Sequence, residues 1–111
     1  SVSQNGSDVI VRAGGEETIL GEHYYAFRSA SRTILTTSAA TGALAYGLEI
    51  SGGPTEVVIQ NGQATVTAHG PAGDRRLILP GFTQPTAPIV YQNGAFWLPY
   101  AGGNPVTAVV R

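Results

Sequence analysis

Glycine and proline recur along the whole chain and divide it into short segments. The 111 residues include 15 Gly and 7 Pro, which are spread rather than gathered in one linker. Because Gly lowers helix stability and Pro interrupts helices and sheet ladders, few segments are long enough for a helix. The runs between them are rich in Val, Ile, Thr and aromatic residues, which is typical of β-strands. The sequence therefore predicts an all-β protein.

Short strands separated by turn residues at intervals of roughly 8–12 residues are typical of antiparallel sandwiches and barrels. A chain of this length closes one core and not two, so we predict a single antiparallel β-sandwich domain, jelly-roll or Greek-key in type, over residues 1–111. Residues 38–45 alone have the composition of a helical turn. The predicted strands are 8–12, 18–20, 24–28, 33–37, 44–50, 56–60, 63–68, 75–79, 89–92, 95–98 and 106–110.

The tripeptide Gln-Asn-Gly occurs three times, at 4–6, 60–62 and 92–94. Asn-Gly tolerates positive φ at both central positions of a type I′ turn, so each copy predicts a hairpin. A two-residue loop at the second copy places Val57, Ile59, Ala64 and Val66 on one face and polar residues on the other. This is the pattern of a hairpin that is solvated on one side.

The same register at the third copy gives two apolar faces. One face carries Ile89, Tyr91, Phe96 and Leu98, and the other carries Val90, Gln92, Ala95 and Trp97. One face can join the core, while the second needs another cover: the rest of the monomer, a neighbouring subunit or a ligand. Pro88 and Pro99 bracket this hairpin, which predicts a place at a sheet edge because Pro cannot donate to a ladder.

The remaining aromatic residues fall in two segments. In an extended strand over 24–28, Tyr25 and Phe27 share one face and are predicted to be core, which leaves Tyr24 beside Arg28 near the surface. The alternation Leu44, Tyr46, Leu48 and Ile50 predicts a strand whose Tyr46 is core. The segment from 80 to 88 holds three prolines and predicts an ordered crossover between the two sheets, anchored by Phe82.

Charge and motif content exclude several function classes. The formal net charge is −1 and the charged fraction is 12%, about half the globular average of roughly 25%. A nucleic-acid partner is not expected, because the chain has no basic stripe to follow phosphates. The chain has no cysteine and no catalytic or metal-binding motif, so we expect no metal, no cofactor and no enzymatic activity. Adjacent Arg75 and Arg76 are interpreted mainly as solvated, although such a pair also suits an oxyanion.

The chain has no apolar run near the ~20 residues needed to span a bilayer, so no membrane span is expected. Low charge with abundant Ser and Thr favours an exported protein, and Arg without Lys favours a bacterial source. In composition and architecture the chain is similar to β-sandwich modules appended to bacterial polysaccharide-degrading enzymes. That likeness implies a non-catalytic carbohydrate-binding role and a secreted location.

Three function classes stay open. The first is a polysaccharide-binding or accessory module in which aromatic faces stack on sugar rings. The second is an assembly subunit, such as a phage or pilus-like component or another homo-oligomer, that meets a partner protein subunit through the 88–100 hairpin. The third is a small enzyme with a scattered site, which we do not favour. The predicted ligand-binding residues are Trp97, Tyr91, Tyr100, Tyr24, Arg28, Gln92 and Asn93.

Overall fold

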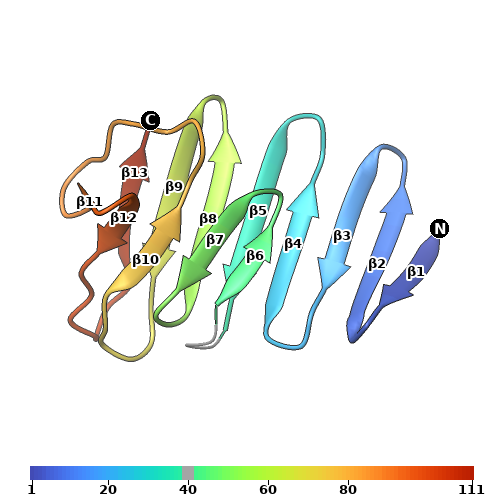
Figure 1. Ribbon diagram of the computed structural model, residues 1–111, viewed down its shortest axis with the longest axis horizontal. Helices are drawn as coiled ribbons and strands as arrows, with labels where there is room; N and C mark the ends of the chain where they lie inside the picture. The colour runs from blue at the N-terminus through green and yellow to red at the C-terminus, as the bar shows by residue number, and fades with distance from the viewer. Residues whose placement is uncertain (39–41) are drawn as a thin grey trace.

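The computed structural model describes residues 1–38 and 42–111, which contain thirteen β-strands and no helix (Figure 1). It follows that these residues hold no helix that could cross a membrane. The strands are β1 Val2–Asn5, β2 Asp8–Ala13, β3 Glu16–Leu20, β4 Tyr24–Arg28, β5 Arg32–Thr37, β6 Ala43–Ala45, β7 Leu48–Ser51, β8 Thr55–Gln60, β9 Gln63–Ala68, β10 Arg75–Ile78, β11 Val90–Gln92, β12 Ala95–Leu98 and β13 Val106–Val110.

The strands form two antiparallel sheets. The large sheet has the order β1-β2-β3-β4-β5-β8-β9-β13, and the small sheet has the order β11-β12-β10-β7-β6. Figure 1 shows the small sheet lying in front of one half of the large sheet. The predicted all-β, two-sheet sandwich is confirmed.

Connections between the sheets are of the Greek-key kind. β5 and β8 are neighbours in the large sheet, and the β6–β7 hairpin between them lies in the small sheet. In the same way β7 pairs with β10 in the small sheet, while the β8–β9 hairpin between them lies in the large sheet. Each such excursion ends beside the strand from which it began.

The core lies between the facing sides of the two sheets. Ala26, Leu35, Val57, Val66 and Ala108 are register partners from β4 across to β13, and all are buried. Burying one Val or Leu side chain contributes about 1.5–3 kcal/mol, so this row is a principal source of stability. The small sheet contributes the buried side chains of Leu48, Ile50, Leu77, Phe96 and Leu98.

Two of the three Gln-Asn-Gly hairpins have the predicted register. Asn61-Gly62 and Asn93-Gly94 both have positive φ at both positions, as a type I′ turn requires. The first copy differs by one residue: Asn5 pairs with Asp8, and Gly6-Ser7 makes the turn. Only Gly6 has positive φ there, which is the pattern of a type II′ turn. This hairpin adds β1, a strand that the sequence did not predict.

The predicted strand 44–50 is wrong. Tyr46 and Gly47 form a two-residue turn with φ of 55° and 77°, so the segment is a hairpin in which Ala45 pairs with Leu48. The reversal shifts the alternation, leaving Leu44 66% exposed and burying Ala45. Tyr46 therefore lies on a turn and not in a strand. Of the predicted helical turn at 38–45, residues 39–41 lie outside the described residues, and Ala43–Ala45 is strand.

The segment from 80 to 88 connects β10 to β11. Because both strands belong to the small sheet, the segment is not the connection from one sheet to the other that was predicted. Its middle pairs with the large sheet, where Pro85 bridges Val110 and Thr86 exchanges hydrogen bonds with Val109. This pairing covers the outer edge of β13, which would otherwise present unpaired backbone groups. Phe82 packs against the core, as expected.

At the opposite end the large sheet extends beyond the small sheet. The small sheet ends at β6, which lies in front of β5 in Figure 1. Strands β1 to β4, called the overhang below, therefore have no strand of the small sheet in front of them. No residue of β1, β2 or β3 is buried. β1 to β3 thus form a single β-layer attached to the sandwich, whereas β4 contributes the buried Ala26 to the core.

Candidate functional site

The two adjacent arginines have opposite environments, because successive residues of β10 point to opposite faces of the small sheet. Arg75 is fully buried, so the expectation that both arginines are solvated is wrong for this residue. Arg76 lies on the outer face as the register partner of Trp97, and its guanidinium is 3.7 Å from the Glu49 carboxylate.

Arg75 holds together the loops around it. Its guanidinium donates to the carbonyl oxygens of Gly73 at 2.6 Å and His69 at 2.7 Å, with longer bonds to Pro71, Gly52 and Pro54. A Cβ atom at position 53 would lie 2.5 Å from the Arg75 Cζ atom, so Gly is required there. Burial lowers the pKa of the Arg75 guanidinium. These contacts give Arg75 a structural role in fixing residues 69–75 beside β12.

The outer face of the small sheet carries the predicted aromatic site. Trp97 lies between its register partners Val90 and Arg76. The Trp97 indole Nε1–H donates to the Gln92 carbonyl oxygen at 3.1 Å, which fixes the orientation of the ring. A depression of about 360 Å³ adjoins the ring, and we call it the Trp97 depression; its lining residues are Asp74, Val90, Gln92, Asn93, Trp97 and Pro99.

Of the seven predicted site residues, the structure brings together Trp97, Gln92 and Asn93. Tyr91 is 60% exposed but lies on the other face of the hairpin, where its ring meets the Phe96 ring edge-on at 5.0 Å. Tyr100 is 4% exposed, and its hydroxyl donates to the Gly103 carbonyl oxygen at 2.7 Å. These two tyrosines do not line the Trp97 depression.

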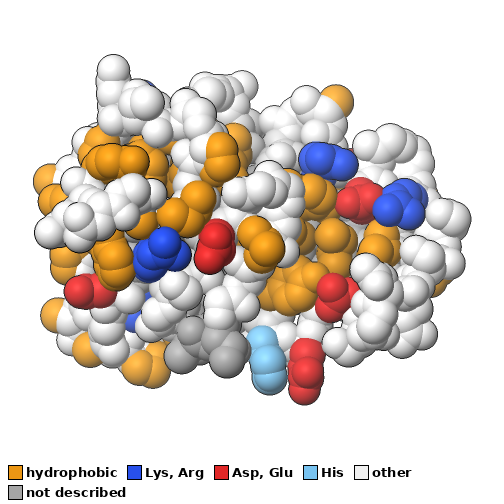
Figure 2. All heavy atoms as spheres, in the orientation of Figure 1, with side chains coloured by type: hydrophobic (Ala, Val, Ile, Leu, Met, Phe, Trp, Pro, Cys, Tyr) orange, Lys and Arg blue, Asp and Glu red, His pale blue; other side chains and the backbone are white. Residues whose placement is uncertain are grey.

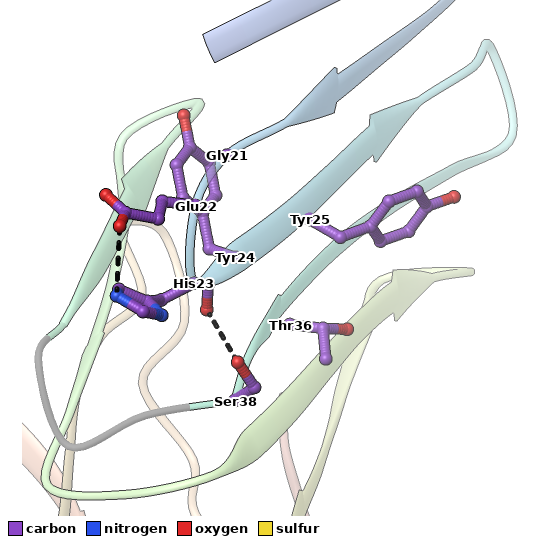
Figure 3. A pocket seen from close by; sticks show the side chains of 7 residues that line it. All are labelled: Gly21, Glu22, His23, Tyr24, Tyr25, Thr36 and Ser38. Atoms are coloured by element: carbon purple, nitrogen blue, oxygen red, sulfur yellow. Dashed lines mark hydrogen bonds and ion pairs between the residues drawn. The ribbon is translucent and has the colours of Figure 1, made fainter. Parts of the chain in front are cut away.

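Tyr24 and Arg28 lie far along the large sheet, on the inner face of the overhang. The predicted facing of β4 is wrong: Ala26 is buried and Tyr24 packs against the core, whereas Tyr25 and Phe27 are on the outer face. Figure 3 shows Tyr24 and Tyr25 on opposite sides of β4. Two aromatic residues in one strand suggested a core pair, but the register places Ala26 beside the buried Leu35, so Tyr25 and Phe27 face outward.

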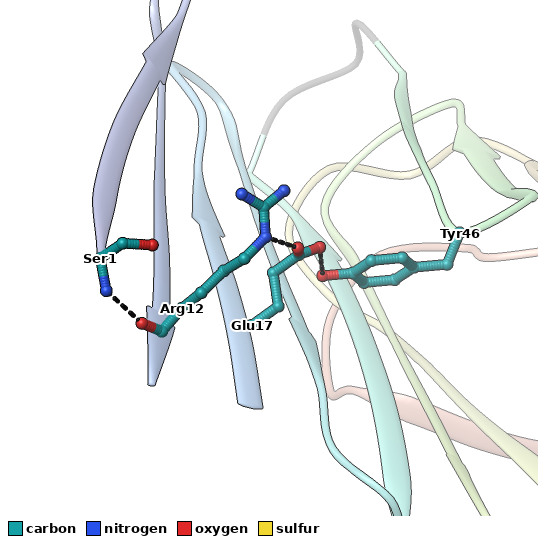
Figure 4. Close-up of polar contacts among 4 residues, drawn as sticks. All are labelled: Ser1, Arg12, Glu17 and Tyr46. Atoms are coloured by element: carbon teal, nitrogen blue, oxygen red, sulfur yellow. Dashed lines mark hydrogen bonds and ion pairs between the residues drawn. The ribbon is translucent and has the colours of Figure 1, made fainter. Parts of the chain in front are cut away.

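A polar network joins the overhang to the small sheet (Figure 4). Glu17 accepts from Arg12 Nε at 2.6 Å and from the Tyr46 hydroxyl at 3.1 Å, so the β6–β7 turn is tied to β3. The Arg28 guanidinium lies 4.5 Å from the centre of the Tyr46 ring. The hydrogen bond from Arg12 lowers the pKa of Glu17, which stabilises the charged carboxylate. This network was not predicted, because it depends on the turn at Tyr46.

Two tyrosines in this region resist ionisation. Burial, together with a hydrogen bond to a carboxylate, raises the pKa of Tyr24 and of Tyr46 to about 12; the carboxylates are those of Asp8 and Glu17. The folded state thus holds these protons more tightly than the unfolded chain. Their stabilising contribution is full below pH 10 and is lost as the pH rises toward about 12.

We therefore expect two of the five tyrosines to ionise with a midpoint near pH 12, as measured by phenolate absorbance. Tyr24→Phe and Tyr46→Phe should each remove one of these late transitions. Denaturant unfolding of the wild-type protein should show stability falling between pH 10 and 12, and less steeply in the double variant. Full ionisation of all tyrosines near pH 10 in the folded protein would contradict this assignment.

The end of the β4–β5 pair forms a second depression, of about 250 Å³, lined by residues from 21 to 25 with Thr36 and Ser38. Figure 3 shows Glu22 and His23 in this depression. They lie in a bend before β4, with Glu22 Oε1 and His23 Nε2 3.8 Å apart. Both side chains are mostly exposed, so this ion pair contributes little to the stability of the fold.

Within residues 1–38 and 42–111, no three His, Asp or Glu side chains gather closely enough to hold a metal ion. Comparisons with protein-family models, with curated proteins and with solved structures found no match to this chain. The functional assignment therefore depends on the geometry of the described residues alone.

Proposed function

We propose that this protein is a non-catalytic recognition module that binds polysaccharide at the Trp97 depression. The observation that carries the proposal is the fixed, partly exposed indole of Trp97 in a depression that Gln92, Asn93 and Asp74 also line. An aromatic face packs well against the apolar face of a sugar ring, and amide and carboxylate groups hydrogen-bond to its hydroxyls.

The site is rigid before any ligand arrives. Trp97 lies in β12, which is paired on both sides, with β10 and with β11. Asn93 lies in a tight turn. Asp74 lies in the loop before β10, and Arg75 holds this loop through its hydrogen bond to the Gly73 carbonyl oxygen. Side chains that are already ordered lose less conformational entropy on binding, which favours affinity from a small contact area.

The position of the site suits an extended ligand. β11 is the edge strand of the small sheet, so a polymer crossing Trp97 can continue past this edge without meeting another strand. Low charge with abundant Ser and Thr supports a secreted protein, and Arg without Lys supports a bacterial source, so we place the chain as an accessory module of a bacterial polysaccharide-active protein. Use of the 88–100 hairpin as a subunit interface is less well supported, because Ile89, Phe96 and Leu98 are already buried within the monomer.

Substitution of the site residues tests this proposal. We expect Trp97→Ala to weaken binding to the recognised polysaccharide by at least about fivefold, since loss of one aromatic stacking contact costs roughly 1–3 kcal/mol. Gln92→Ala should weaken binding less. Tyr91→Ala, on the opposite face of the same hairpin, is the matched control and should leave binding unchanged.

Affinity electrophoresis in gels containing soluble polysaccharides, and depletion onto insoluble ones, measures these effects. Thermal melts must first show that each variant is folded. Equal binding by the wild type and Trp97→Ala, or a requirement for Tyr91 instead, would contradict the proposed site.

A further inference from the structure

The three Asn-Gly pairs of the chain are alike in sequence and differ in backbone conformation. Each Asn follows a Gln, and each is exposed to solvent. Asn61 and Asn93 are the first residues of their turns, with φ of 55° and 53°. Asn5 is instead the last residue of β1 and has extended backbone, because Gly6 and Ser7 make the turn there. A difference in reactivity among the three pairs would therefore come from the fold.

An Asn-Gly pair can lose its side-chain amide without an enzyme. The backbone nitrogen of the Gly attacks the Asn Cγ atom and forms a new N–Cγ bond. The bond from Cγ to the side-chain nitrogen breaks, and ammonia leaves with the proton of the Gly N–H. Water then opens the five-membered imide at either carbonyl, which gives aspartate or isoaspartate. Gly favours the attack because it has no Cβ atom to hinder its nitrogen.

Ring closure requires a rotation about the Asn Cα–C bond, and the three sites start at different angles. The ring contains the Gly nitrogen and the Asn Cβ atom, so these two atoms must become nearly eclipsed about that bond. In an L residue this occurs at ψ of about −120°, which is about 105° from the extended value of about +135° and about 165° from the left-handed value of about +47°. In the left-handed turns at Asn61 and Asn93 the two atoms are therefore nearly opposite, whereas Asn5 starts closer to the reactive geometry.

The strand that contains Asn5 is also weakly held. All four β1 residues are exposed, and β1 pairs with β2 alone. In Figure 2 the end of the molecule where β1 lies presents few apolar side chains on this face. By contrast, the turn at Asn61 joins two strands that are each paired on both sides, and the turn at Asn93 precedes β12, whose Phe96 and Leu98 are buried. Segments with few buried contacts open at low free energy, so Asn5 can rotate while the sandwich stays folded.

We propose that Asn5 is a site of spontaneous deamidation, and that the left-handed turns at Asn61 and Asn93 protect these two residues from the same reaction. Asn5 combines extended backbone with a strand that opens easily. The other two residues start from the least favourable ψ and are exposed to the same solvent. Asn93 lines the Trp97 depression, so its turn also preserves the side-chain amide at that site.

Conversion of Asn5 weakens the hairpin that contains it. Asn5 and Asp8 are register partners, so their side chains are on the same face of the sheet. The Asp8 carboxylate accepts a hydrogen bond from the Tyr24 hydroxyl at 2.6 Å. Either product adds a carboxylate opposite Asp8, and like charges directly opposite each other destabilise a strand pair. Isoaspartate also lengthens the backbone next to a two-residue turn. We therefore expect β1 to separate from β2 after the reaction, while the strands that contribute buried residues stay folded.

Peptide mapping by mass spectrometry, after incubation of the folded protein in mildly alkaline buffer, tests the proposal. The chain has Arg and no Lys, so trypsin places the three Asn-Gly pairs in separate peptides, 1–12, 33–75 and 77–111. The mass of each peptide shows whether ammonia has been lost and water added. We expect Asn5 to react at least about tenfold faster than Asn61 and Asn93, which corresponds to about 1.4 kcal/mol in the free energy of reaching the reactive geometry.

The unfolded chain and a conservative variant are the controls. In urea all three pairs should react at similar rates, since their neighbours in sequence match. Asn5→Gln keeps a side-chain amide but needs a larger ring, so peptide 1–12 should then keep its mass. Asn104, the other Asn of peptide 77–111, precedes a Pro, which has no N–H for the attack. An Asn5 that reacts no faster than Asn61 in the folded protein would overturn the proposal. So would an equally fast Asn93, because β11 is an edge strand like β1 and only the turn distinguishes this site.

Hydrogen exchange tests the consequence for β1. Asn5→Asp carries the charge of the product, and Asn5→Gln is its neutral counterpart. The β1 amides should exchange at least about twofold faster in Asn5→Asp than in Asn5→Gln, while exchange in β8 and β9 should be the same in both variants. Equal exchange of the β1 amides would overturn the release of β1. These measurements need no ligand, so this proposal and the polysaccharide site can fail independently.

Discussion

Arg75→Ala is expected to destabilise the protein by about 3–5 kcal/mol, a large part of the stability of a domain of this size. The substitution removes the donor for five backbone carbonyl oxygens and leaves a cavity at a fully buried position. The carbonyls at 69, 71 and 73 would then need water or new partners. Chemical denaturation with far-ultraviolet circular dichroism measures the change.

The next residue provides the control. Arg76 is on the outer face, with its side chain 40% exposed and a 3.7 Å contact to Glu49, so Arg76→Ala should change stability by no more than about 0.5 kcal/mol. Arg75→Lys keeps the charge but offers fewer donors in another geometry, so its loss of stability should lie between those of Arg75→Ala and Arg76→Ala. Equal effects of Arg75→Ala and Arg76→Ala would show that the loops around 69–75 do not depend on the buried guanidinium.

Leu48→Ala should destabilise the protein by about 2–4 kcal/mol, whereas Leu44→Ala should cost less than about 1 kcal/mol. Both leucines belong to the β6–β7 hairpin, but Leu48 is 4% exposed and Leu44 is 66% exposed. The difference exists only if Tyr46 and Gly47 make a turn. In the continuous strand that the sequence predicted, both leucines would face the core and both substitutions would be costly.

Equilibrium unfolding in urea distinguishes these two cases, because the midpoint shifts with stability while the slope reports the surface exposed. A large loss in Leu44→Ala would contradict the hairpin and restore the strand prediction. Tyr46→Phe is a useful companion variant, since it removes the hydrogen bond to Glu17 and leaves the turn intact.

The sheets were predictable where the local pattern and the turn chemistry agreed. In the 57–66 hairpin, alternation assigned one apolar face and Asn61-Gly62 fixed the register, and the structure has both. The same reasoning gave the register of the 92–95 hairpin. In each case two independent local signals pointed to one answer, so no distant contact was needed.

The prediction failed where distant contacts decide. Tyr46-Gly47 looked like the middle of a strand because Tyr46 fits a period of two, yet Gly47 accepts positive φ and the Tyr46 ring is held by Glu17 and Arg28. In the same way, the facing of β4 depends on where the small sheet ends. Neither fact is encoded within a window of ten residues.

The candidate site was partly predictable for the same reason. Trp97, Gln92 and Asn93 lie within six residues of one another in one hairpin, so the local register was enough to group them. Asp74 and Arg76 join them only because β10 pairs with β12. Tyr24 and Arg28 were grouped with Trp97 on chemical type alone, and the topology places them on the other sheet.

The most direct test of the proposed function is the fluorescence of Trp97, the single tryptophan, measured with a panel of polysaccharides and at several protein concentrations. We predict that acrylamide quenches the free protein equally at every concentration, because Trp97 is partly exposed within the monomer and its site is not a subunit interface. The recognised polysaccharide should shift the emission to shorter wavelength and reduce quenching. If the protein demonstrably binds a polysaccharide and the Trp97 emission does not change, the proposed site is contradicted. If acrylamide quenching of Trp97 decreases as the protein concentration rises, the 88–100 hairpin is a subunit interface.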